Sequence, residues 1–313
     1  MDTDHPVSGM IIPLVTALDP LGRPDPPAVR PLLAHLAAGG VTTLMLAGTN
    51  GEGPLLPADA VRAYAVEVSA MWRDLAGPSA RVMVAAAGTG TRETLRRMDR
   101  LAELDLDAVV VLAPSYFRHT EGELHAHFRD IARHGRPVVV YNSPGYTGNP
   151  VPVSLMRRLL DEPAIIGLKD SSGDAALFAE FCALAGERPD FQVAQGAERQ
   201  LADGLRMGAA GLVPGVGMLA PALCAGLLKA GRGGDHATAA ALQRDVDRLA
   251  ALFAVRPGVS GVVVIKTALH LLGLCPPHAA APFLPLTETE LTELRAALAR
   301  IHDLVGPLDP QPN

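Results

Sequence analysis

Lysine is rare in this chain, and one lysine stands where it could act as a nucleophile. The 27 basic residues comprise 24 Arg and only three Lys, at positions 169, 229 and 266. Arg keeps its proton near neutral pH, whereas a desolvated lysine can lose its proton and attack a ketone to form a Schiff base. Lys169 directly follows the apolar run 164–168, so we expect its amine at the end of a buried strand. A structural lysine paired with a carboxylate is the alternative interpretation.

The other two lysines are poorer candidates for a nucleophile. Lys229 falls at the end of a predicted helix, where a cation interacts favourably with the helix dipole. Lys266 lies inside a predicted C-terminal helix, where we expect it to extend its amine to the surface or to brace that part of the chain.

Two tyrosines and one loop could supply proton transfer and anion binding. Tyr141 ends an apolar run and Tyr116 follows another, and together they are two of only four tyrosines. A phenol beside an amine can move the protons that C–C cleavage requires, although an isolated tyrosine can also be a packing residue. The loop from Gly48 to Gly53 could offer backbone N–H groups and the Thr49 hydroxyl to a carboxylate, or could be an ordinary turn.

Short β-branched or apolar runs alternate with longer segments rich in Ala, Leu and Arg. The predicted strands are 10–16, 41–46, 82–86, 108–112, 137–141, 164–168, 191–194 and 211–213. Predicted helices include 57–75, 92–104, 121–134, 152–160, 175–185, 198–207 and 219–230. Asp174 precedes one of these helices as a cap, and Thr120 precedes another with Glu123 three residues later, as in a capping box.

This alternation predicts an α/β fold, namely a (β/α)8 TIM barrel of parallel strands. An open, doubly wound sheet is the second choice, but the first predicted strand is not followed by the GxGxxG turn expected there. After Ala230 only helical patterns remain, at 235–253, 259–272 and 287–304. We therefore expect a barrel over residues 1–230 and a three-helix C-terminal appendage over 231–313 that packs on it.

Composition and charge exclude several function classes. The 313 residues are 49% hydrophobic and carry a formal charge of 27 − 33 = −6, which argues against nucleic acid as a partner. Three separated cysteines, an acidic N-terminus without an apolar signal region, and no apolar run long enough to span a bilayer predict a cytoplasmic protein away from the membrane. His125 and His127 diverge on a predicted helix, and no metal motif is present, so we expect neither a metal nor a cofactor.

Three segments at predicted strand ends resemble one enzyme family. GTNGEGPLL from Gly48, YNSPGYTG from Tyr141 and GLKDSSGD from Gly167 match, in order, the G-[ST]-x-G-E, Y-N-x-P-x-x-T-G and G-x-K-x-x-x-G-[DN] patterns of that family. It is the pyruvate-dependent class I aldolase family, which includes dihydrodipicolinate synthase and N-acetylneuraminate lyase. The resemblance extends from about Gly9 to Leu304 and implies a barrel with a helical C-terminal appendage, as a homo-oligomer, either a dimer or a tetramer.

The resemblance also implies roles for individual residues. Lys169 would form the Schiff base, Tyr141 would shuttle protons, and Thr49 would relay them, with Tyr116 completing the relay across a subunit interface. The Thr49 and Asn50 amides would bind the carboxylate of pyruvate. Gly48, Tyr146 and Gly196 complete the predicted substrate-binding set.

Departures from the family pattern suggest the substrate. Dihydrodipicolinate synthases usually carry an Arg at the position of Tyr146, where it would pair with the carboxylate of the second substrate. We therefore expect an aldolase or lyase that cleaves a 4-hydroxy-2-oxo acid to pyruvate and an aldehyde, or that runs the condensation. An authentic 4-hydroxy-tetrahydrodipicolinate synthase, using pyruvate and aspartate semialdehyde, and a catalytically silent barrel that binds a 2-oxo acid are the alternatives.

Overall fold

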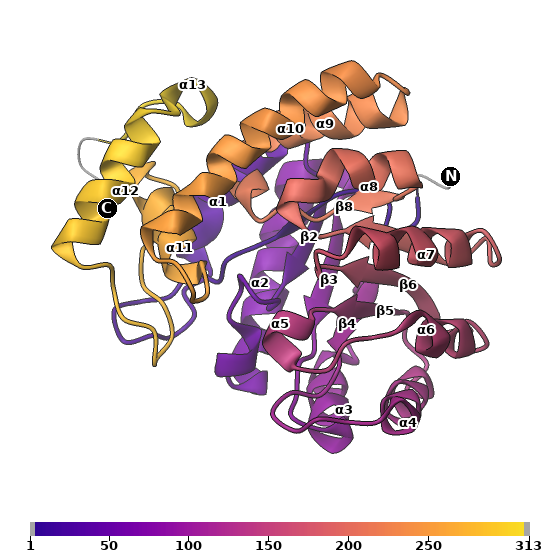
Figure 1. The fold of residues 1–313 in the computed structure, drawn as a ribbon. Helices are drawn as coiled ribbons and strands as arrows, with labels where there is room; N and C mark the ends of the chain where they lie inside the picture. The colour runs from indigo at the N-terminus through magenta and orange to yellow at the C-terminus, as the bar shows by residue number, and fades with distance from the viewer. Residues whose placement is uncertain (1–3, 310–313) are drawn as a thin grey trace.

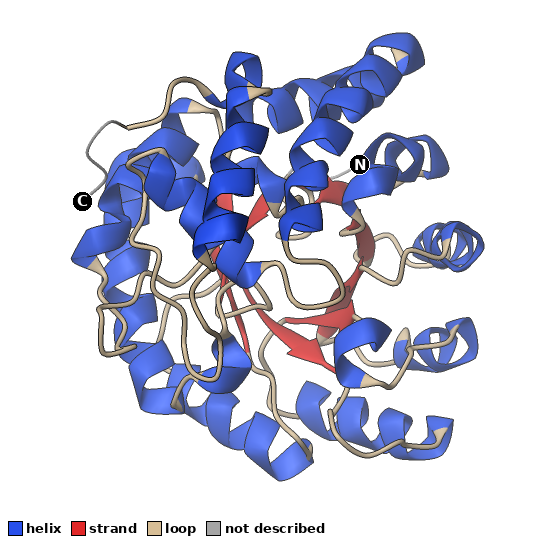
Figure 2. Ribbon diagram, turned by 60° about the vertical axis from the view of Figure 1, so that its left-hand side comes forward, coloured by secondary structure: helices blue, strands red, loops and turns tan. Residues whose placement is uncertain are grey.

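A closed barrel of eight parallel strands in chain order forms the centre of the molecule. The structure is a computed structural model and describes residues 4–309. The strands are β1 (Gly9–Pro13), β2 (Thr43–Leu46), β3 (Arg81–Ala85), β4 (Ala108–Leu112), β5 (Val138–Asn142), β6 (Ile165–Asp170), β7 (Gln192–Gln195) and β8 (Gly211–Leu212). Figure 2 shows them as a ring enclosed by helices. The predicted (β/α)8 barrel is confirmed, and the doubly wound alternative is wrong because β1 pairs with β8 and closes the sheet.

A helix follows every strand and covers the outside of the barrel. These helices are α1 (Arg30–Ala38), α2 (Ala58–Ala76), α3 (Thr91–Leu101), α4 (Glu121–Ala132), α6 (Val153–Leu159), α7 (Ala175–Ala185), α8 (Leu201–Met207) and α9 (Pro221–Arg232), with the short α5 (Pro144–Thr147) inserted after β5. Both predicted caps are confirmed. Thr120 and Glu123 form a capping box at α4, and the Asp174 carboxylate accepts hydrogen bonds from two backbone N–H groups of α7.

The strands are buried on both faces, which explains their continuous apolar sequences. Their outward side chains pack under the helices, and their inward side chains fill the barrel with a second apolar cluster. That inner cluster includes Ile11, Met45, Met83, Val110 and Val139. The barrel is therefore a packed core, and a polar group can reach solvent only at its two ends.

Two predicted boundaries differ from the structure in ways that matter for the site. Strand β6 does not stop at Leu168 but continues through Asp170, because Lys169 and Asp170 stay in the ladders with β5 and β7. The predicted helix 198–207 is divided into a short 3-10 turn, η4 (Glu198–Gln200), and α8, because Gln200 has a non-helical backbone at their junction.

The C-terminal helices share an apolar core with the barrel. They are α10 (His236–Ala250), α11 (Val262–Leu271), α12 (Glu288–Ala299) and α13 (His302–Val305), and they occupy the three predicted helical segments. Figure 1 shows α10 along α9, and α11 to α13 grouped on one side of the barrel. Buried residues of α10, α11 and α12 belong to the same cluster as Leu32 and Leu36 of α1. The exact division at residue 230 stays a prediction.

Within residues 4–309, no helix combines the length and the apolar character needed to cross a membrane. The cytoplasmic localisation and the absence of a nucleic-acid partner stay predictions.

Phe128 offers a test of the outer core. Its side chain on α4 is fully buried, so Phe128→Ala should lower the free energy of unfolding by about 3–5 kcal/mol, through lost burial and a residual cavity. The chain has one tryptophan, Trp72, which is also fully buried. Its fluorescence should show that Phe128→Ala unfolds at a lower urea concentration than the native protein. Glu180→Ala, at an exposed position of α7, is the control and should leave the midpoint nearly unchanged. Equal midpoints for the two variants would contradict this account of the core.

Candidate active site

Strand register brings Lys169 and Tyr141 together at the carboxyl end of the barrel. The two residues are direct partners in the β5–β6 ladder, and both are almost fully buried. The Nζ atom of Lys169 lies 4.0 Å from the centroid of the Tyr141 ring, within the range of a cation–π contact. The amine therefore has an aromatic and a phenolic neighbour where the barrel opens.

Thr49 joins this pair from the loop between β2 and α2. Its Oγ1 atom lies 3.4 Å from the hydroxyl oxygen of Tyr141. The loop is tightly folded, since Ala47 and Glu52 both have positive φ angles, of 53° and 57°. Gly53 is required there because a Cβ atom at this position would stand 1.8 Å from the carbonyl oxygen of Ala47. The loop thus holds Thr49 in one place over the barrel.

The surroundings of Tyr141 lower the pKa of its phenol. Burial acts to raise this pKa, but the charge of Lys169 and hydrogen bonds with the hydroxyls of Thr49, Ser143 and Ser171 act in the opposite direction and prevail. A phenol with a lowered pKa gives up its proton more readily, so Tyr141 is suited to act as a general base and then as an acid.

These residues open into a cavity of about 380 Å³, which we call the catalytic cavity. Its walls include Thr49, Asn50, Tyr141, Tyr146, Lys169, Gly196 and Glu198. Among residues 4–309, we find no acceptor for the backbone N–H groups of Thr49 and Asn50, so both are free to bind an anion. The cavity is large enough for a small 2-oxo acid and part of a second reactant.

The two glycines that were predicted to bind substrate, Gly48 and Gly196, have different surroundings. Gly196 lies against Lys169, since a Cβ atom there would come within 2.9 Å of Cε of Lys169 and 2.2 Å of the Ser171 hydroxyl. The N–H of Gly196 already donates to the carbonyl oxygen of Asp170, at 2.7 Å. Gly48 does not line the catalytic cavity, and its carbonyl oxygen accepts a hydrogen bond from the N–H of Gly53. Both glycines shape the site by allowing close packing.

Glu198 is a cavity residue that the sequence analysis did not assign to the site. One of its carboxylate oxygens, Oε1, accepts a hydrogen bond from the N–H of Val216 at 2.8 Å, and burial raises the pKa of the carboxyl group. Its signal in the sequence is an acidic side chain four residues after a predicted strand end, which is too common a feature to single it out. Among the cavity-lining residues, Glu198 is the only acidic side chain and Lys169 the only basic one.

A second missed group holds the ends of β5 and β6 together. The side-chain amide of Asn142 donates to Asp170 at 2.7 Å, and the hydroxyl of Ser172 donates to the other carboxylate oxygen at 2.9 Å. The carbonyl oxygen of the Asn142 amide accepts from the N–H of Val151. This buried network fixes the strands that carry Tyr141 and Lys169.

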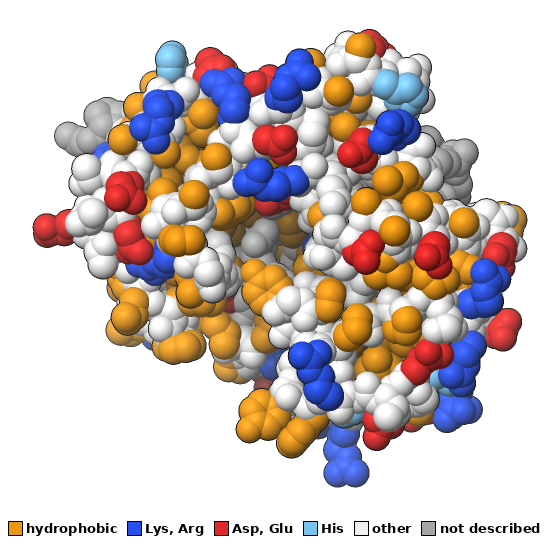
Figure 3. Space-filling model, in the orientation of Figure 1, with side chains coloured by type: hydrophobic (Ala, Val, Ile, Leu, Met, Phe, Trp, Pro, Cys, Tyr) orange, Lys and Arg blue, Asp and Glu red, His pale blue; other side chains and the backbone are white. Residues whose placement is uncertain are grey.

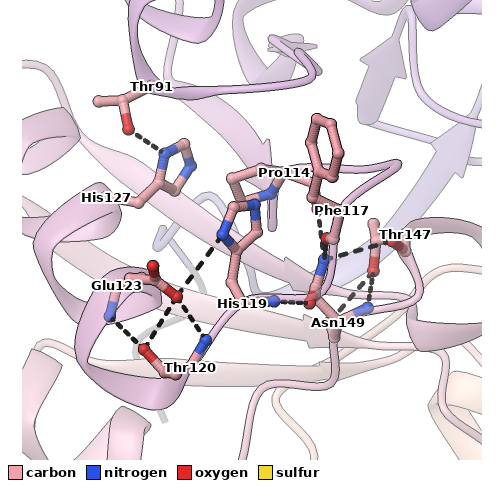
Figure 4. A network of polar contacts seen from close by, with 9 residues as sticks. All are labelled: Thr91, Pro114, Phe117, His119, Thr120, Glu123, His127, Thr147 and Asn149. Carbon is pink, nitrogen blue, oxygen red and sulfur yellow. Dashed lines mark hydrogen bonds and ion pairs between the residues drawn. The ribbon is translucent and has the colours of Figure 1, made fainter.

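Tyr116 lies outside the catalytic cavity of its own chain. It has a φ of 82°, and 85% of its surface is exposed, beside the exposed Phe117. Asn149 holds the segment that carries it, because its amide group donates to the carbonyl oxygens of Pro114 and Phe117 and accepts from the N–H of His119 (Figure 4). The exposed position of Tyr116 is therefore fixed by buried hydrogen bonds at both ends of its segment.

Within the described part of the chain, no group of three or more His, Cys, Asp or Glu side chains could hold a metal ion. His125 and His127 do not converge on a common site: His127 is buried and pairs with the Thr91 hydroxyl at 2.9 Å (Figure 4). The three cysteines are free thiols.

Comparison with known proteins agrees with this geometry. The model of the dihydrodipicolinate synthetase family matches residues 6–301. The chain belongs to this family. Family members are class I pyruvate-dependent lyases and synthases, so the chain is an enzyme of that class, and the expected family resemblance is confirmed.

Relatives within the dihydrodipicolinate synthetase family carry two kinds of name. A 4-hydroxy-tetrahydrodipicolinate synthase of Corynebacterium aurimucosum is 30% identical over 94% of this chain and 92% of its own length. The putative 2-dehydro-3-deoxy-D-gluconate aldolase YagE of Escherichia coli is 29% identical over 94% of this chain and 97% of its own length. The crystal structure of YagE in complex with pyruvate superposes with a TM-score of 0.87, covering 95% of this chain and 99% of YagE.

The neighbourhood of Tyr141 leads to a testable prediction about the titration of its phenol. Tyr141 should titrate below its ordinary pKa, and Lys169→Met should raise that pKa because the phenolate loses a nearby positive charge. Carbon-13 NMR of labelled tyrosine measures both values. Tyr64, whose pKa burial raises, is an internal control that the substitution should not move. An unchanged Tyr141 titration in Lys169→Met would refute the electrostatic coupling.

Proposed function

We propose that this enzyme is a Schiff-base aldolase that cleaves a 4-hydroxy-2-oxo acid to pyruvate and a neutral, hydroxylated aldehyde. The observation that carries the proposal is the cluster of the buried Lys169 and Tyr141 with Thr49, with 4.0 Å between the amine and the centroid of the phenol ring and 3.4 Å between the two hydroxyl oxygens. These are a nucleophile, a phenol for proton transfer and a hydroxyl to relay the proton, all within one cavity.

Each step of the reaction has a group to perform it. The Lys169 amine attacks the C2 ketone, and loss of water gives a protonated imine that can accept the electron pair of the breaking C3–C4 bond. The Tyr141 phenolate removes the proton of the C4 hydroxyl, the aldehyde leaves, and Tyr141 then returns this proton to C3 of the resulting enamine, which restores the protonated imine. Hydrolysis of the imine then releases pyruvate and restores the amine. Thr49 connects Tyr141 with the cavity as the proton relay.

The free N–H groups of Thr49 and Asn50 are suited to the C1 carboxylate. Two adjacent backbone donors form an anion-binding turn, and an anion there needs no further cation. Binding the carboxylate in this turn orients the C2 ketone toward Lys169.

The charges in the catalytic cavity favour an uncharged aldehyde. A second carboxylate would lie near Glu198 and would find no cation other than Lys169, which is already joined to the 2-oxo acid. Hydroxyl groups, in contrast, can donate to Glu198 and exchange hydrogen bonds with Tyr146. The name of YagE, a putative 2-dehydro-3-deoxy-D-gluconate aldolase, denotes a 2-oxo acid of this hydroxylated kind.

Tyr116 supports the proposal that the enzyme works as a homo-oligomer. Its exposed ring packs edge-on against the exposed Phe117, with 4.8 Å between the ring centroids, and Tyr146 at the catalytic cavity is exposed as well. Figure 3 shows one face of the molecule, where apolar side chains are interspersed with charged ones of both signs. Packing of the Tyr116–Phe117 segments of two subunits against each other would bring Tyr116 of the partner subunit toward Thr49 and extend the proton relay.

A 4-hydroxy-tetrahydrodipicolinate synthase is the second candidate, because relatives at 30% identity carry that name. It would use the same Lys169 chemistry with pyruvate and aspartate semialdehyde. The two candidates differ in the charge of the aldehyde, which is the property that Tyr146 and Glu198 are expected to select.

Trapping the imine tests the reaction class. Borohydride reduction in the presence of pyruvate should attach a pyruvate-derived mass to the peptide that contains Lys169, as peptide mass spectrometry would reveal. Lys169→Arg should abolish both labelling and turnover despite its positive charge, since guanidinium is a poor nucleophile at neutral pH. Labelling of Lys229 or Lys266 in place of Lys169 would overturn the assignment.

Substitution of Tyr146 tests whether the enzyme prefers an uncharged or a carboxylated aldehyde. The native enzyme should turn over pyruvate with glyceraldehyde better than with aspartate semialdehyde. Tyr146→Arg should raise kcat/KM for aspartate semialdehyde about tenfold to a hundredfold, because a bidentate charge-assisted pair contributes about 1.5–3 kcal/mol. Tyr146→Phe, which keeps the ring, is the matched control. Efficient use of aspartate semialdehyde by the native enzyme would favour the synthase instead.

A further inference from the structure

A buried ion pair connects the C-terminal helices to the loop that carries Thr49. Lys266 of α11 donates to Oε1 of Glu52, and both side chains are completely shielded from solvent. Lys266 also donates to the carbonyl oxygen of His278, and Oε2 of Glu52 accepts from the N–H of Ala280 at 2.6 Å. The loop that contains Glu52 and two neighbouring segments near the C-terminus, more than 200 residues away in sequence, therefore meet at one carboxylate.

Glu52 is directly tied to the residues that face the catalytic cavity. Its N–H donates to the carbonyl oxygen of Thr49 at 3.1 Å, and its φ of 57° completes the turn that begins at Thr49. From other sides, the Thr16 hydroxyl donates to the carbonyl oxygen of Gly51 at 2.6 Å, and Arg97 donates to that of Gly53 at 3.2 Å. A displacement of Glu52 would therefore move Thr49 within an otherwise restrained loop.

Stability alone is a poor explanation for this ion pair. Burying two charges has a large desolvation cost, and well-packed apolar residues often stabilise a core equally well or better. Apart from Lys266, Thr267 and His270, α11 consists of apolar residues, so an apolar side chain at 266 would suit its surroundings. A compact ammonium group is nevertheless present in a chain that uses Arg at 24 of its 27 basic positions.

We propose that Lys266 is a positioning residue, which acts through Glu52 to hold the Thr49–Asn50 turn in the geometry that binds the pyruvate carboxylate and contacts Tyr141. This inference rests on the proposed function of that turn. The C-terminal helices are then part of the catalytic unit, although they contribute none of the reacting groups.

Lys266→Met removes the ammonium group, keeps much of the side-chain volume and leaves Glu52 unpaired. We expect kcat/KM to fall about tenfold to a hundredfold, with a raised KM for pyruvate, because small misplacements of a positioning group have effects of this size. At saturating pyruvate, borohydride should still label Lys169. The Tyr141 pKa, measured by the NMR titration, should rise because Thr49 no longer reaches the phenol.

Two further variants separate positioning from general destabilisation. Leu298→Ala, at a buried position of α12, a helix that makes no hydrogen bond with Glu52 or Lys266, should lower the unfolding midpoint and leave KM and the Tyr141 titration unchanged. Adding Glu52→Gln to Lys266→Met removes the unpaired charge and should recover part of the lost activity. Glu52→Gln alone should raise KM and replaces Lys266→Met as the test if that variant does not fold.

Native KM, kcat and Tyr141 titration in a folded Lys266→Met or Glu52→Gln variant would overturn the proposal, as would the same changes in Leu298→Ala. Failure of the native enzyme to label Lys169 would instead refute the proposed function, because that result does not depend on Lys266.

Discussion

The burial of a primary amine at the mouth of the barrel is the constraint on which this site depends. Closing eight parallel strands brings their carboxyl ends to one opening, while apolar side chains fill the space beneath. Lys169 is almost fully buried there, and its Nζ atom lies over the ring of Tyr141. Because the two residues are direct ladder partners, the register of β5 and β6 sets the contact between nucleophile and phenol.

Lys169 and Tyr141 are fixed at the ends of strands, and the loop that carries Thr49 must be positioned equally well. Thr49 lies on a loop, and loops generally move more than the elements they connect. Here the loop has two residues with positive φ, a glycine that no other residue could replace, and a buried carboxylate, Glu52, bound to the C-terminal helices. The helices that follow the barrel therefore contribute to the rigidity of the site from its outer side.

The sequence predicted the parts of this arrangement that depend on local pattern. Alternating apolar runs indicated the barrel, and the rarity of lysine together with its place after an apolar run indicated Lys169. The contact between Lys266 and Glu52 could not be predicted, since 214 residues separate them and nothing in the GTNGEGPLL segment that contains Glu52 indicates a partner in a C-terminal helix. The sequence also could not indicate how Gly196 shapes the cavity, where its N–H donates to Asp170 and its missing side chain makes room for Lys169.

The few charged groups that line the catalytic cavity bear on which aldehyde can be used as the second reactant. The backbone N–H groups of Thr49 and Asn50 can bind the C1 carboxylate of the substrate, so no cationic side chain is needed for this purpose. In the function that we propose, the side chains of the cavity beyond Lys169, among them Tyr146 and Glu198, select the second reactant. A hydroxyl-bearing aldehyde can satisfy both groups, whereas a carboxylated aldehyde would bring a second negative charge beside Glu198. Selectivity would then arise from the sign of the charge facing the aldehyde, separately from the Lys169 amine.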